Sequence, residues 1–590
     1  MPKSYETLVE LFDLSTAEFA GNEFLGSKHP DGNWTWMSYR DFRKAVEDAR
    51  AGLHALGVRS GDRVAVVSDN RPEWAVLCFA TFSLGACFVP MYEEQQPDEW
   101  AFILEDCRAK VAFGSLRSVF ERLAAETSKL PFVEHVLGFE LEPSDTASYA
   151  QLIAAGHKNP VPAAQVAPDD IASFIYTSGT TGNPKGVKLS HKNFSTNVLG
   201  SSSRFNFGPG DRSLAFLPWA HSFGQVAELY TFLHFGAAIA INDSKANLIN
   251  NLAVVRPTIL VAVPRIFNRI YDGVNKQIAQ KPAPIQKLFR AGIRAATKKN
   301  RGESIGFSEK LALKAADKLI FGKVRLRFGG RLRFVVSGSA ALSTEVAEFI
   351  DALGIDVYEG YGLTETSPVV SVNYPGHRKI GTVGPPIPGV TVRIDHEATG
   401  DEINGEIIIS GPNVMQGYHD RDEENAAVLQ ADGSLRSGDM GYLDADGFLV
   451  LTGRIKEQYK LENGKYVVPS PLEEELKLSP HILNVMLHGA NRLHNVALVV
   501  IDEASVRSWA KDEGITLGDA TQNPEVKKLI RAELERYSAT FKGYERPRDF
   551  VLALEDFSSE NGMLTPSLKV KRRYVLARYG DALEALYSKG

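Results

Sequence analysis

Ten residues from Thr177 to Gly186 combine the groups that a protein needs to bind phosphate. The string Thr-Ser-Gly-Thr-Thr-Gly-Asn-Pro-Lys-Gly contains three glycines, several hydroxyl side chains and Lys185. Glycines allow backbone N–H groups to turn toward an anion, hydroxyls add donors, and lysine adds positive charge. The Walker A pattern G-x-x-x-x-G-K-[ST] does not fit the string in any register. The sequence therefore predicts a phosphate-binding loop of another kind.

The residues on either side of this loop indicate how it is held. Ile171 to Tyr176 is apolar enough to form a buried strand, and Val187 to Leu189 is extended. Ser190 is a good N-cap for a helix that begins near His191. We therefore expect the loop to connect two strands, with a helix after the second one.

The order Tyr176-Thr-Ser-Gly-Thr-Thr-Gly-x-Pro-Lys-Gly-Val187 resembles the signature of the adenylate-forming superfamily. Acyl-CoA synthetases, peptide-synthetase adenylation domains and beetle luciferases belong to it. Its members join a carboxylate to the α-phosphate of ATP, forming acyl-AMP and pyrophosphate. The resemblance implies that the loop binds ATP through Thr177, Ser178, Gly179, Thr180, Thr181, Gly182 and Lys185.

Two further stretches resemble nucleotide-binding segments of the same superfamily. Leu332 to Ala341 resembles the adenine-side loop, which implies that Gly338, Ser339 and Ala340 approach the base. Val357 to Thr366 matches a second motif, in which Glu359, Gly360, Tyr361, Gly362 and Thr364 are ATP-binding residues. Tyr361 offers an aromatic face, and Thr364 is expected to donate to the α-phosphate. Glu365 offers the hard oxygen ligand that Mg²⁺ prefers.

The ribose and hinge positions follow later in the chain. By resemblance, Asp439 holds both ribose hydroxyls, Arg454 contacts the ribose and Lys456 is the hinge between two domains. Ser437 stands where Thr is usual, and Glu457 where an Asp is common. The loop with Lys460, Gly464 and Lys465 is expected to cover the site during thioester formation with CoA.

Leu564 to Arg573 resembles the C-terminal motif of long-chain acyl-CoA synthetases. Lys569 corresponds to the catalytic lysine that bridges the carboxylate and the α-phosphate. A flexible ammonium suits that task, because negative charge builds on the attacking and leaving oxygens. Many relatives have Gly-Lys here, whereas this chain has Leu568-Lys569.

Two interpretations of His221 stay open. A single histidine among the apolar residues 214–224 is commonly a core residue. The same stretch resembles the segment that lines the acyl pocket and reaches the carboxylate, which would make His221 catalytic. Val261 to Ile270 resembles a segment of the long-chain branch.

Length and composition agree with a two-domain enzyme. The chain of 590 residues is too long for one core, and 44% hydrophobic and 23% charged residues are ordinary globular values. Helical and extended patterns alternate over residues 38–170, which predicts an α/β fold. We expect a large N-terminal domain (1–452) of β-sheets with flanking helices and a small mobile α+β domain (453–590). Ser470 to Glu473 has the form of a capping box that begins a helix in the small domain.

Net charge, cysteine content and hydropathy indicate which partners and which cellular setting to expect. The net charge of −6 argues against binding nucleic acid through the overall field. Three cysteines (Cys78, Cys87, Cys107) without metal-ligand spacing, and a start without a signal-peptide core, indicate a reduced cytoplasmic setting. The uncharged stretch from Trp74 to Tyr92 is long enough for a membrane span. Gly85 favours a buried helix followed by a strand instead.

Residues 276–333 hold sixteen Lys or Arg against three Asp or Glu. These charges either solvate helices, one of them over Leu311 to Phe321, or attract the phosphates of CoA or an anionic membrane surface. The second interpretation predicts peripheral contact with the inner face of a membrane. The sequence leaves the oligomeric state open.

Taken together, the motifs predict an AMP-forming long-chain fatty acyl-CoA synthetase that uses ATP, Mg²⁺ and CoA. Three alternatives share parts of the pattern. A fatty acyl-AMP ligase that loads a carrier protein has the same ATP motifs, and a medium-chain synthetase differs only in its acyl pocket. A binding protein without turnover would not need Glu365, Asp439 and Lys569 together.

Overall fold

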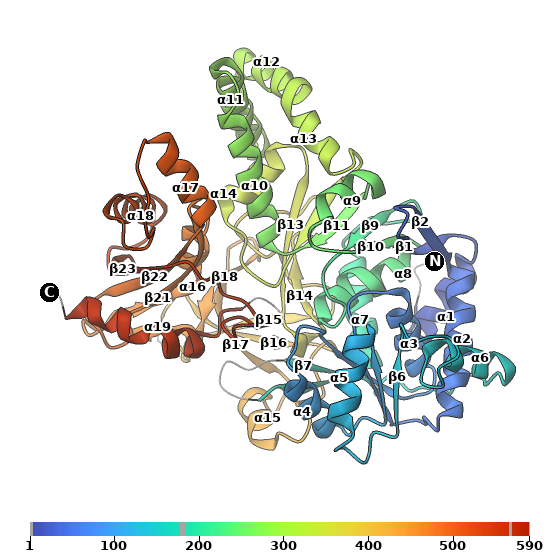
Figure 1. Cartoon of the computed structure of the whole chain (residues 1–590). Coiled ribbons are helices and arrows are strands. Elements are labelled where there is room, and N and C mark those ends of the chain that lie inside the picture. Colours follow the sequence, from blue (N-terminus) through green and yellow to red (C-terminus); the bar gives the residue numbers. More distant parts are fainter. Residues whose placement is uncertain (1–3, 178–182, 400, 566–568, 589–590) are drawn as a thin grey trace.

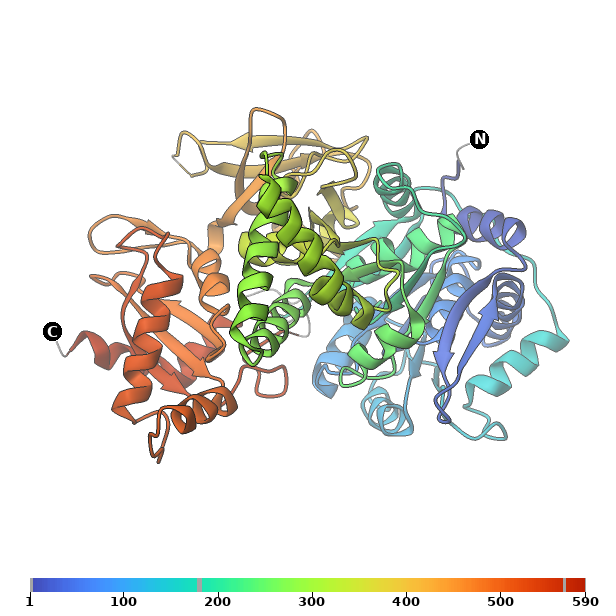
Figure 2. The ribbon, with the colours of Figure 1, turned by 90° about the horizontal axis from the view of Figure 1, so that it is seen from above.

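The structure is a computed structural model that describes residues 4–177, 183–399, 401–565 and 569–588. Figure 1 shows a large N-terminal part built on several sheets and a smaller C-terminal part beside it. Figure 2, turned by 90°, shows the two parts side by side again, with the last elements of the chain at one end. This mixed α/β architecture confirms the predicted fold class.

The first large sheet carries the predicted phosphate loop. Its six strands lie in the order β6-β5-β3-β4-β7-β8. Adjacent strands from β6 to β7 pair in parallel, whereas β7 and β8 form an antiparallel hairpin. The strands are β3 (Arg63–Val67), β4 (Cys87–Met91), β5 (Val111–Gly114), β6 (His135–Gly138), β7 (Ile171–Thr177) and β8 (Lys185–Ser190). Its helices are α2 (Tyr39–Ala55), α3 (Pro72–Phe82), α4 (Pro97–Cys107), α5 (Arg117–Thr127) and α6 (Tyr149–Lys158).

The uncharged stretch that begins at Trp74 forms most of the buried helix α3 and the buried strand β4, as predicted from Gly85. Trp74 lies in the main hydrophobic core, where its ring packs against Phe88 and Trp219. Within the described ranges, helices of sufficient length and apolarity to cross a bilayer are absent.

Three four-stranded sheets complete the large part, in the orders β2-β1-β10-β9, β11-β12-β13-β14 and β15-β16-β17-β18. The first contains β1 (Glu23–Lys28), β2 (Trp34–Ser38), β9 (Arg212–Ala215) and β10 (Ala238–Ile241). The second contains β11 (Ile259–Ala262), β12 (Phe334–Ser337), β13 (Asp356–Gly362) and β14 (Val369–Val372). The third contains β15 (Thr391–Asp395), β16 (Gly405–Ser410), β17 (Leu435–Leu443) and β18 (Leu449–Arg454).

The remaining helices of this part surround the sheets. They are α1 (Leu8–Glu18), α7 (His191–Ser202), the π-helix η1 (Gly224–Tyr230), α8 (Thr231–Phe235), α9 (Leu248–Val255), α10 (Pro264–Ala279), α11 (Ala283–Asn300), α12 (Phe307–Ala316), the π-helical turn η2 (Asp317–Phe321), α13 (Gly322–Arg327), α14 (Thr344–Ala352), the 3-10 turn η3 (Thr364–Thr366) and α15 (Asp422–Val428). Ser190 caps α7 in a capping box with Asn193, so that expectation is confirmed.

The C-terminal part is a separate α+β module with its own apolar clusters. Its three-stranded sheet consists of β21 (Ile482–His488), β22 (Asn495–Ile501) and β23 (Pro547–Ala553), and a short hairpin consists of β19 (Tyr459–Lys460) and β20 (Tyr466–Val467). Its helices are η4 (Ile455–Glu457), α16 (Pro469–Leu476), α17 (Glu503–Asp512), α18 (Pro524–Tyr537) and α19 (Arg572–Tyr587). The boundary at residues 452/453 stays a prediction.

The predicted capping box at Ser470 is wrong. Helix α16 begins at Pro469, after Val468, without a side-chain cap. Proline fixes its own φ near the helical value, so Pro469 can occupy the first turn unaided. The Ser470 hydroxyl donates to Glu457 in η4 instead.

Candidate active site

The β7–β8 hairpin presents the two ends of the phosphate loop. Thr177 pairs with Lys185 across the hairpin. Gly186 faces the ring of Tyr176, where an added Cβ would lie 2.9 Å from Cζ, so the position requires glycine. Ser178, Gly179, Thr180, Thr181 and Gly182 lie outside the described residues. The hairpin is thus fixed at both ends of the loop.

Lys185 contacts a segment that is distant in sequence. Its Nζ atom lies 3.5 Å from Glu424 Oε1 and 5.2 Å from the centroid of the Tyr418 ring. Neither Glu424 nor Tyr418 belongs to a motif in the sequence. The bridge between Val187 and Tyr418 brings them to this lysine, and such pairing of remote segments has no local sequence signal.

The second motif occupies the end of β13 and the turn η3. An added Cβ on Gly362 would lie 1.7 Å from the Pro368 carbonyl oxygen, and one on Gly360 would lie 3.2 Å from that of Ser371. Both glycines therefore permit close approach of β14. Burial raises the pKa of Glu359 to about 7, against the lowering effect of bonds from the amides of Gly381 and Leu342.

Thr364 and Glu365 follow directly, and each has a side-chain partner among the described residues. The Thr364 and Ser222 hydroxyl oxygens are 3.2 Å apart in a buried contact. The Tyr418 hydroxyl donates to Glu365 Oε1 at 2.8 Å. Ser222 is a further site residue without a motif of its own, although it adjoins His221.

The predicted adenine-side residues form the turn after β12. Ser339 has a φ of +69°, and a Cβ on Gly338 would lie 2.9 Å from the Phe223 ring. Ser339 and Ala340 are exposed to solvent. The turn therefore packs against the segment that contains His221 while its tip stays open.

Asp439, Arg454 and Tyr361 form one cluster, in which Asp439 and Tyr361 are buried and Arg454 is partly exposed. Arg454 Nε lies 2.8 Å from Asp439 Oδ1, and the Tyr361 hydroxyl donates to Oδ2 at 2.7 Å. The charge of Asp439 raises the pKa of Arg454 against the opposing effect of burial. Strands β17 and β18 place Asp439 directly opposite Arg454, and Tyr361 comes from β13.

His221 is half-buried at the start of the segment that leads into η1. Its Nδ1 accepts the Phe223 amide at 3.2 Å. Burial, and secondly the charge of Lys569, lowers its pKa to about 4. The imidazole is therefore neutral at pH 7, and with Nδ1 accepting, Nε2 carries the proton and can donate.

Lys569 is exposed to solvent, and its ammonium interacts electrostatically with charged residues of the same cluster. Desolvation and then the charge of Arg454 lower its pKa, and Asp439, Glu365 and Glu457 act in the opposite direction. Its backbone is held by reciprocal bonds with Thr565. The structure therefore brings position 569 to the ATP motifs of the large part.

The thioester-loop positions contact residues of the C-terminal part, whereas the hinge position follows Arg454 closely in the chain. Lys456 is in η4. Lys460 and Lys465 lie over the rings of Tyr466 and Tyr544, and Gly464 has a φ of +84° in the tight turn between β19 and β20. The contacts of Lys460 and Lys465 with aromatic rings thus lie within the C-terminal part.

The site residues fit a single Mg²⁺ ion. Glu365 offers one carboxylate, and among the described residues no group of three His, Cys, Asp or Glu side chains could enclose a metal. Mg²⁺ commonly keeps several waters and takes one or two carboxylates plus substrate phosphates. One carboxylate next to a phosphate loop meets that requirement.

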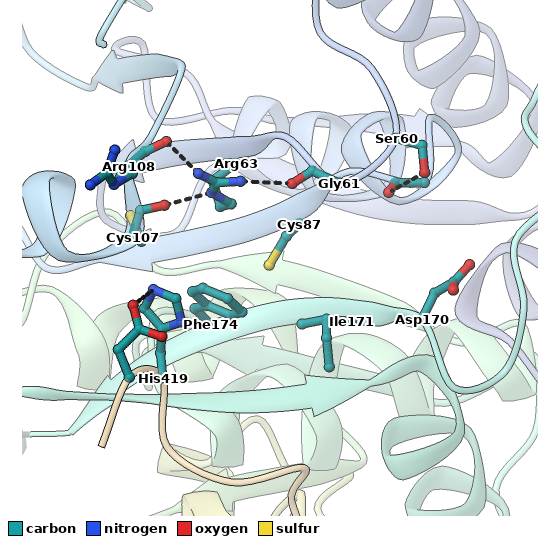
Figure 3. Close-up of a pocket in the computed structure, with 12 residues that line it drawn as sticks. Ser60, Gly61, Arg63, Cys87, Cys107, Arg108, Asp170, Ile171, Phe174 and His419 are labelled. Carbon is teal, nitrogen blue, oxygen red and sulfur yellow. Dashed lines mark hydrogen bonds and ion pairs between the residues drawn. The ribbon is translucent and has the colours of Figure 1, made fainter. Parts of the chain in front are cut away.

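A separate pocket of about 340 Å³ lies against the sheet that carries the phosphate loop (Figure 3). Phe174 and Ile171 of β7 line it, and His419 packs against Phe174 with 4.9 Å between ring centroids. Arg63 donates to the carbonyls of Gly61, Cys107 and Arg108 there. Predicted site residues are absent from its described lining.

Comparisons with known proteins agree with this geometry. A family model described as AMP-binding enzyme matches residues 14–419, and one described as AMP-binding enzyme C-terminal domain matches residues 456–590. The chain therefore belongs to the AMP-binding enzyme family, which confirms the resemblance in the sequence. It is an adenylate-forming, acyl-activating enzyme and, by family, an ATP-binding ligase.

Similar proteins cover nearly the whole chain. Long chain acyl-CoA synthetase 7, peroxisomal, of Arabidopsis thaliana is 31% identical, over 99% of this chain and 86% of its own. Long-chain-fatty-acid–CoA ligase FadD15 of Mycobacterium bovis is 33% identical, over 95% of this chain and 93% of its own. The adenylation domain of the carboxylate reductase of Mycobacterium chelonae superposes with a TM-score of 0.81 at 25% identity, over 99% of this chain and 91% of that domain.

Proposed function

We propose that this chain is an AMP-forming long-chain-fatty-acid–CoA ligase. The observation that carries the proposal is the convergence of Lys569 from the C-terminal part with Asp439 and Glu365 of the large part and with Arg454 at the junction between them. The names of the relatives, which cover nearly the full chain, support the long-chain acid and CoA as substrates.

In the first half-reaction, a carboxylate oxygen of the acid attacks the α-phosphorus of ATP. The bond from that phosphorus to the bridging β-oxygen breaks, and pyrophosphate leaves. Lys569 stabilises the charge on the attacking carboxylate and the α-phosphate. Thr364 donates to the α-phosphate, and His221 orients the carboxylate through Nε2–H. Glu365 would hold Mg²⁺, which supplies charge neutralisation on the phosphates when bound.

The nucleotide is held by the remaining predicted residues. Asp439 and Arg454 bind the ribose. Tyr361 and the Gly338–Ala340 turn contact adenine. Glu359 and the glycines on either side of Tyr361 shape the adenine side of the site. The phosphate loop from Thr177 to Lys185 holds the triphosphate. Lys185 must exchange its contact with Glu424 for the phosphates, and a partly exposed pair at 3.5 Å costs little to break.

In the second half-reaction, the CoA thiolate attacks the acyl carbon, the bond to the AMP oxygen breaks, and AMP leaves. One lysine geometry does not serve both steps, so we infer that the small domain (453–590) rotates about Lys456. This rotation removes Lys569 and brings Lys460, Gly464 and Lys465 over the site. Hinges of this type absorb large changes in a few backbone dihedrals.

An acyl-chain panel with ATP and CoA, reading AMP, pyrophosphate and thioester separately, tests the proposal. Each buried methylene contributes about 0.8 kcal/mol, so palmitate should be used far better than acetate. Equal turnover of acetate and palmitate would contradict the long-chain assignment, and a maximum at intermediate length would indicate a medium-chain enzyme. Release of pyrophosphate without acyl-CoA would indicate a ligase that loads a carrier protein.

We further propose a cytoplasmic location with peripheral attachment at the inner face of a membrane. The supporting observation is the excess of positive charge in residues 276–333. Fractionation of cells at low and high salt tests it, because an electrostatic attachment is weakened by screening.

A further inference from the structure

The helices α12 and α13 project an apolar surface into solvent. Residues 307–327 form one continuous helical path through α12, η2 and α13, and α11 and α12 extend beyond the sheets at the top of Figure 1. Among the large apolar side chains with substantial exposure, Phe307 is 84% exposed, Leu311 61%, Leu319 50% and Leu326 66%. Their spacings of four, eight and seven residues keep them on one side of a helix. We call this set the outer apolar stripe.

The opposite side of the same path already has its partner. Ala316, Ile320 and Phe321 are buried in the second hydrophobic core. Phe321 packs against Phe289 of α11 with 6.0 Å between ring centroids. A Cβ on Gly292 of α11 would lie 2.3 Å from that of Ala316, so the two helices are in close contact. The outer apolar stripe is therefore not needed for packing within the chain.

Positive charge accompanies the outer apolar stripe. Lys310, Lys314, Lys318, Lys323 and Arg327 are exposed, and none of them forms an ion pair within the described residues. The two acidic residues of the path are already paired, Glu309 with Lys298 and Asp317 with Arg325, each at 2.8 Å. The surface thus presents apolar side chains among cations that lack counter-ions.

We propose that this face of α12, η2 and α13 is a docking surface for an anionic lipid bilayer. Leucine and phenylalanine side chains enter the boundary between headgroups and acyl chains, while lysines extend toward the lipid phosphates. A second copy of this chain is a poor occupant, because two faces of the same charge would repel each other. The purpose of the surface rests on the proposed function, since a long-chain acid is concentrated in such a bilayer.

Sedimentation of the full-length protein with vesicles, without ATP, acid or CoA, tests the proposal independently of catalysis. We expect binding to phosphatidylcholine vesicles that contain phosphatidylserine and much weaker binding to phosphatidylcholine alone, with loss at high salt. Each cation near the surface contributes about a fivefold factor. The double variant Lys314→Gln/Lys318→Gln should therefore bind more than tenfold less tightly, on the order of the product of two such factors.

The double variant Leu311→Ser/Leu326→Ser keeps every charge and should also lose at least about tenfold in vesicle affinity. Matched controls change equally exposed residues elsewhere. Ile403→Ser/Leu493→Ser removes apolar side chains that are 64% and 68% exposed, and Lys527→Gln/Lys528→Gln removes two exposed cations of α18. Both controls should bind vesicles as the unaltered protein does. Thermal midpoints of all variants verify folding.

Two results would overturn the proposal. One is equal binding of the unaltered protein to vesicles with and without phosphatidylserine. The other is vesicle binding that survives both the Lys314/Lys318 variant and the Leu311/Leu326 variant. If these two variants instead convert a dimer to a monomer in analytical ultracentrifugation, the face is a self-association surface. Failure of the acyl-chain panel with intact vesicle binding would reject only the proposed substrate.

Discussion

The Nε atom of Arg454 lies 2.8 Å from Oδ1 of Asp439, where strand β18 ends and the hinge region begins. The other carboxylate oxygen accepts the Tyr361 hydroxyl. The predicted ribose carboxylate is therefore held from two sides, by one residue of the adenine segment and one at the domain junction. A conservative substitution at Asp439 or Arg454 is expected to weaken nucleotide binding more than it lowers the free energy of unfolding.

Asp439→Asn should raise the KM for ATP by about ten- to a hundredfold, because a hydrogen bond to a charged group contributes about 1.5–3 kcal/mol. The amide keeps the shape of the side chain and loses the charge that pairs with Arg454. Pyrophosphate release at varied ATP measures the effect. Asp446→Asn, at a position 72% exposed, is the control and should leave KM unchanged. An unchanged KM for Asp439→Asn would argue against a role at the ribose.

Lys569→Ala should lower the rate of acyl-AMP formation by at least about a hundredfold, on the scale of one lost electrostatic stabiliser in a transition state. Thioester formation from supplied acyl-AMP and CoA should largely survive, because the proposed rotation takes the lysine out of the site before that step. Arg573→Ala removes an exposed cation nearby and serves as the control. Equal loss of both half-reactions would reject the role of Lys569.

Tyr418→Phe removes the hydroxyl that donates to Glu365 and keeps the ring beside Lys185. Outer partners of a metal-binding carboxylate commonly contribute about tenfold or more to affinity or activity. We therefore expect the Mg²⁺ concentration for half-maximal pyrophosphate release to rise about tenfold. Tyr466→Phe, whose ring lies over Lys460, is the control for the adenylation step. If Tyr418→Phe titrates like the unaltered enzyme, Glu365 is not the Mg²⁺ ligand.

Glu228 predicts a pH dependence of stability. This carboxyl is buried in η1; burial raises its pKa to about 8, and the neighbouring Ser213 and Trp219 lower it only partly. Neither oxygen has a hydrogen bond of normal geometry within the described residues. The folded state therefore keeps a proton that the unfolded state releases above its ordinary pKa of 4.5. The free energy of unfolding should therefore fall as pH rises from 4.5 to about 8, by up to about 1.4 kcal/mol per pH unit.

Glu228→Gln removes this proton and keeps the shape of the side chain. The thermal midpoint of the variant should exceed that of the unaltered protein by an amount that grows from about pH 5 to pH 8, across the window between the two pKa values. Glu513→Gln, an exposed position, should show no such trend. Parallel curves for Glu228→Gln and the unaltered protein would show that Glu228 does not titrate on unfolding.

Much of the fold could be predicted because its signals are local. The apolar run from Ile171, the N-cap at Ser190 and the glycine at 85 each act within a few residues, and the strand, helix and turn they predicted are present. Pro469 shows the limit of such signals. Two prolines and a serine close together offer several starting points for α16, and the contact with Glu457 decides among them.

The residues of the candidate site also divide into those that a local sequence pattern identifies and those that only tertiary contacts identify. Glu365, Asp439 and Lys569 stand in motifs, and their types alone indicate chemistry. Motif residues also have partners that stand in no motif: Tyr418 contacts Glu365, Ser222 contacts Thr364, and Glu424 contacts Lys185. Tertiary pairing brings these partners in, as the bridge between Val187 and Tyr418 shows. A tyrosine after a glycine in a loop carries no local pattern that would identify it as a partner of Glu365.

The seam between the two domains contains long ionic contacts, Arg265 with Asp556 at 3.8 Å and Lys571 with Glu99 at 4.0 Å, beside a small apolar contact around Leu478. Water-exposed pairs at such separations add little to the free energy of docking. These contacts would therefore oppose the proposed rotation of the C-terminal part only weakly. Because salt screens such pairs, ionic strength is expected to change the balance between this orientation of the C-terminal part and the rotated one that we propose.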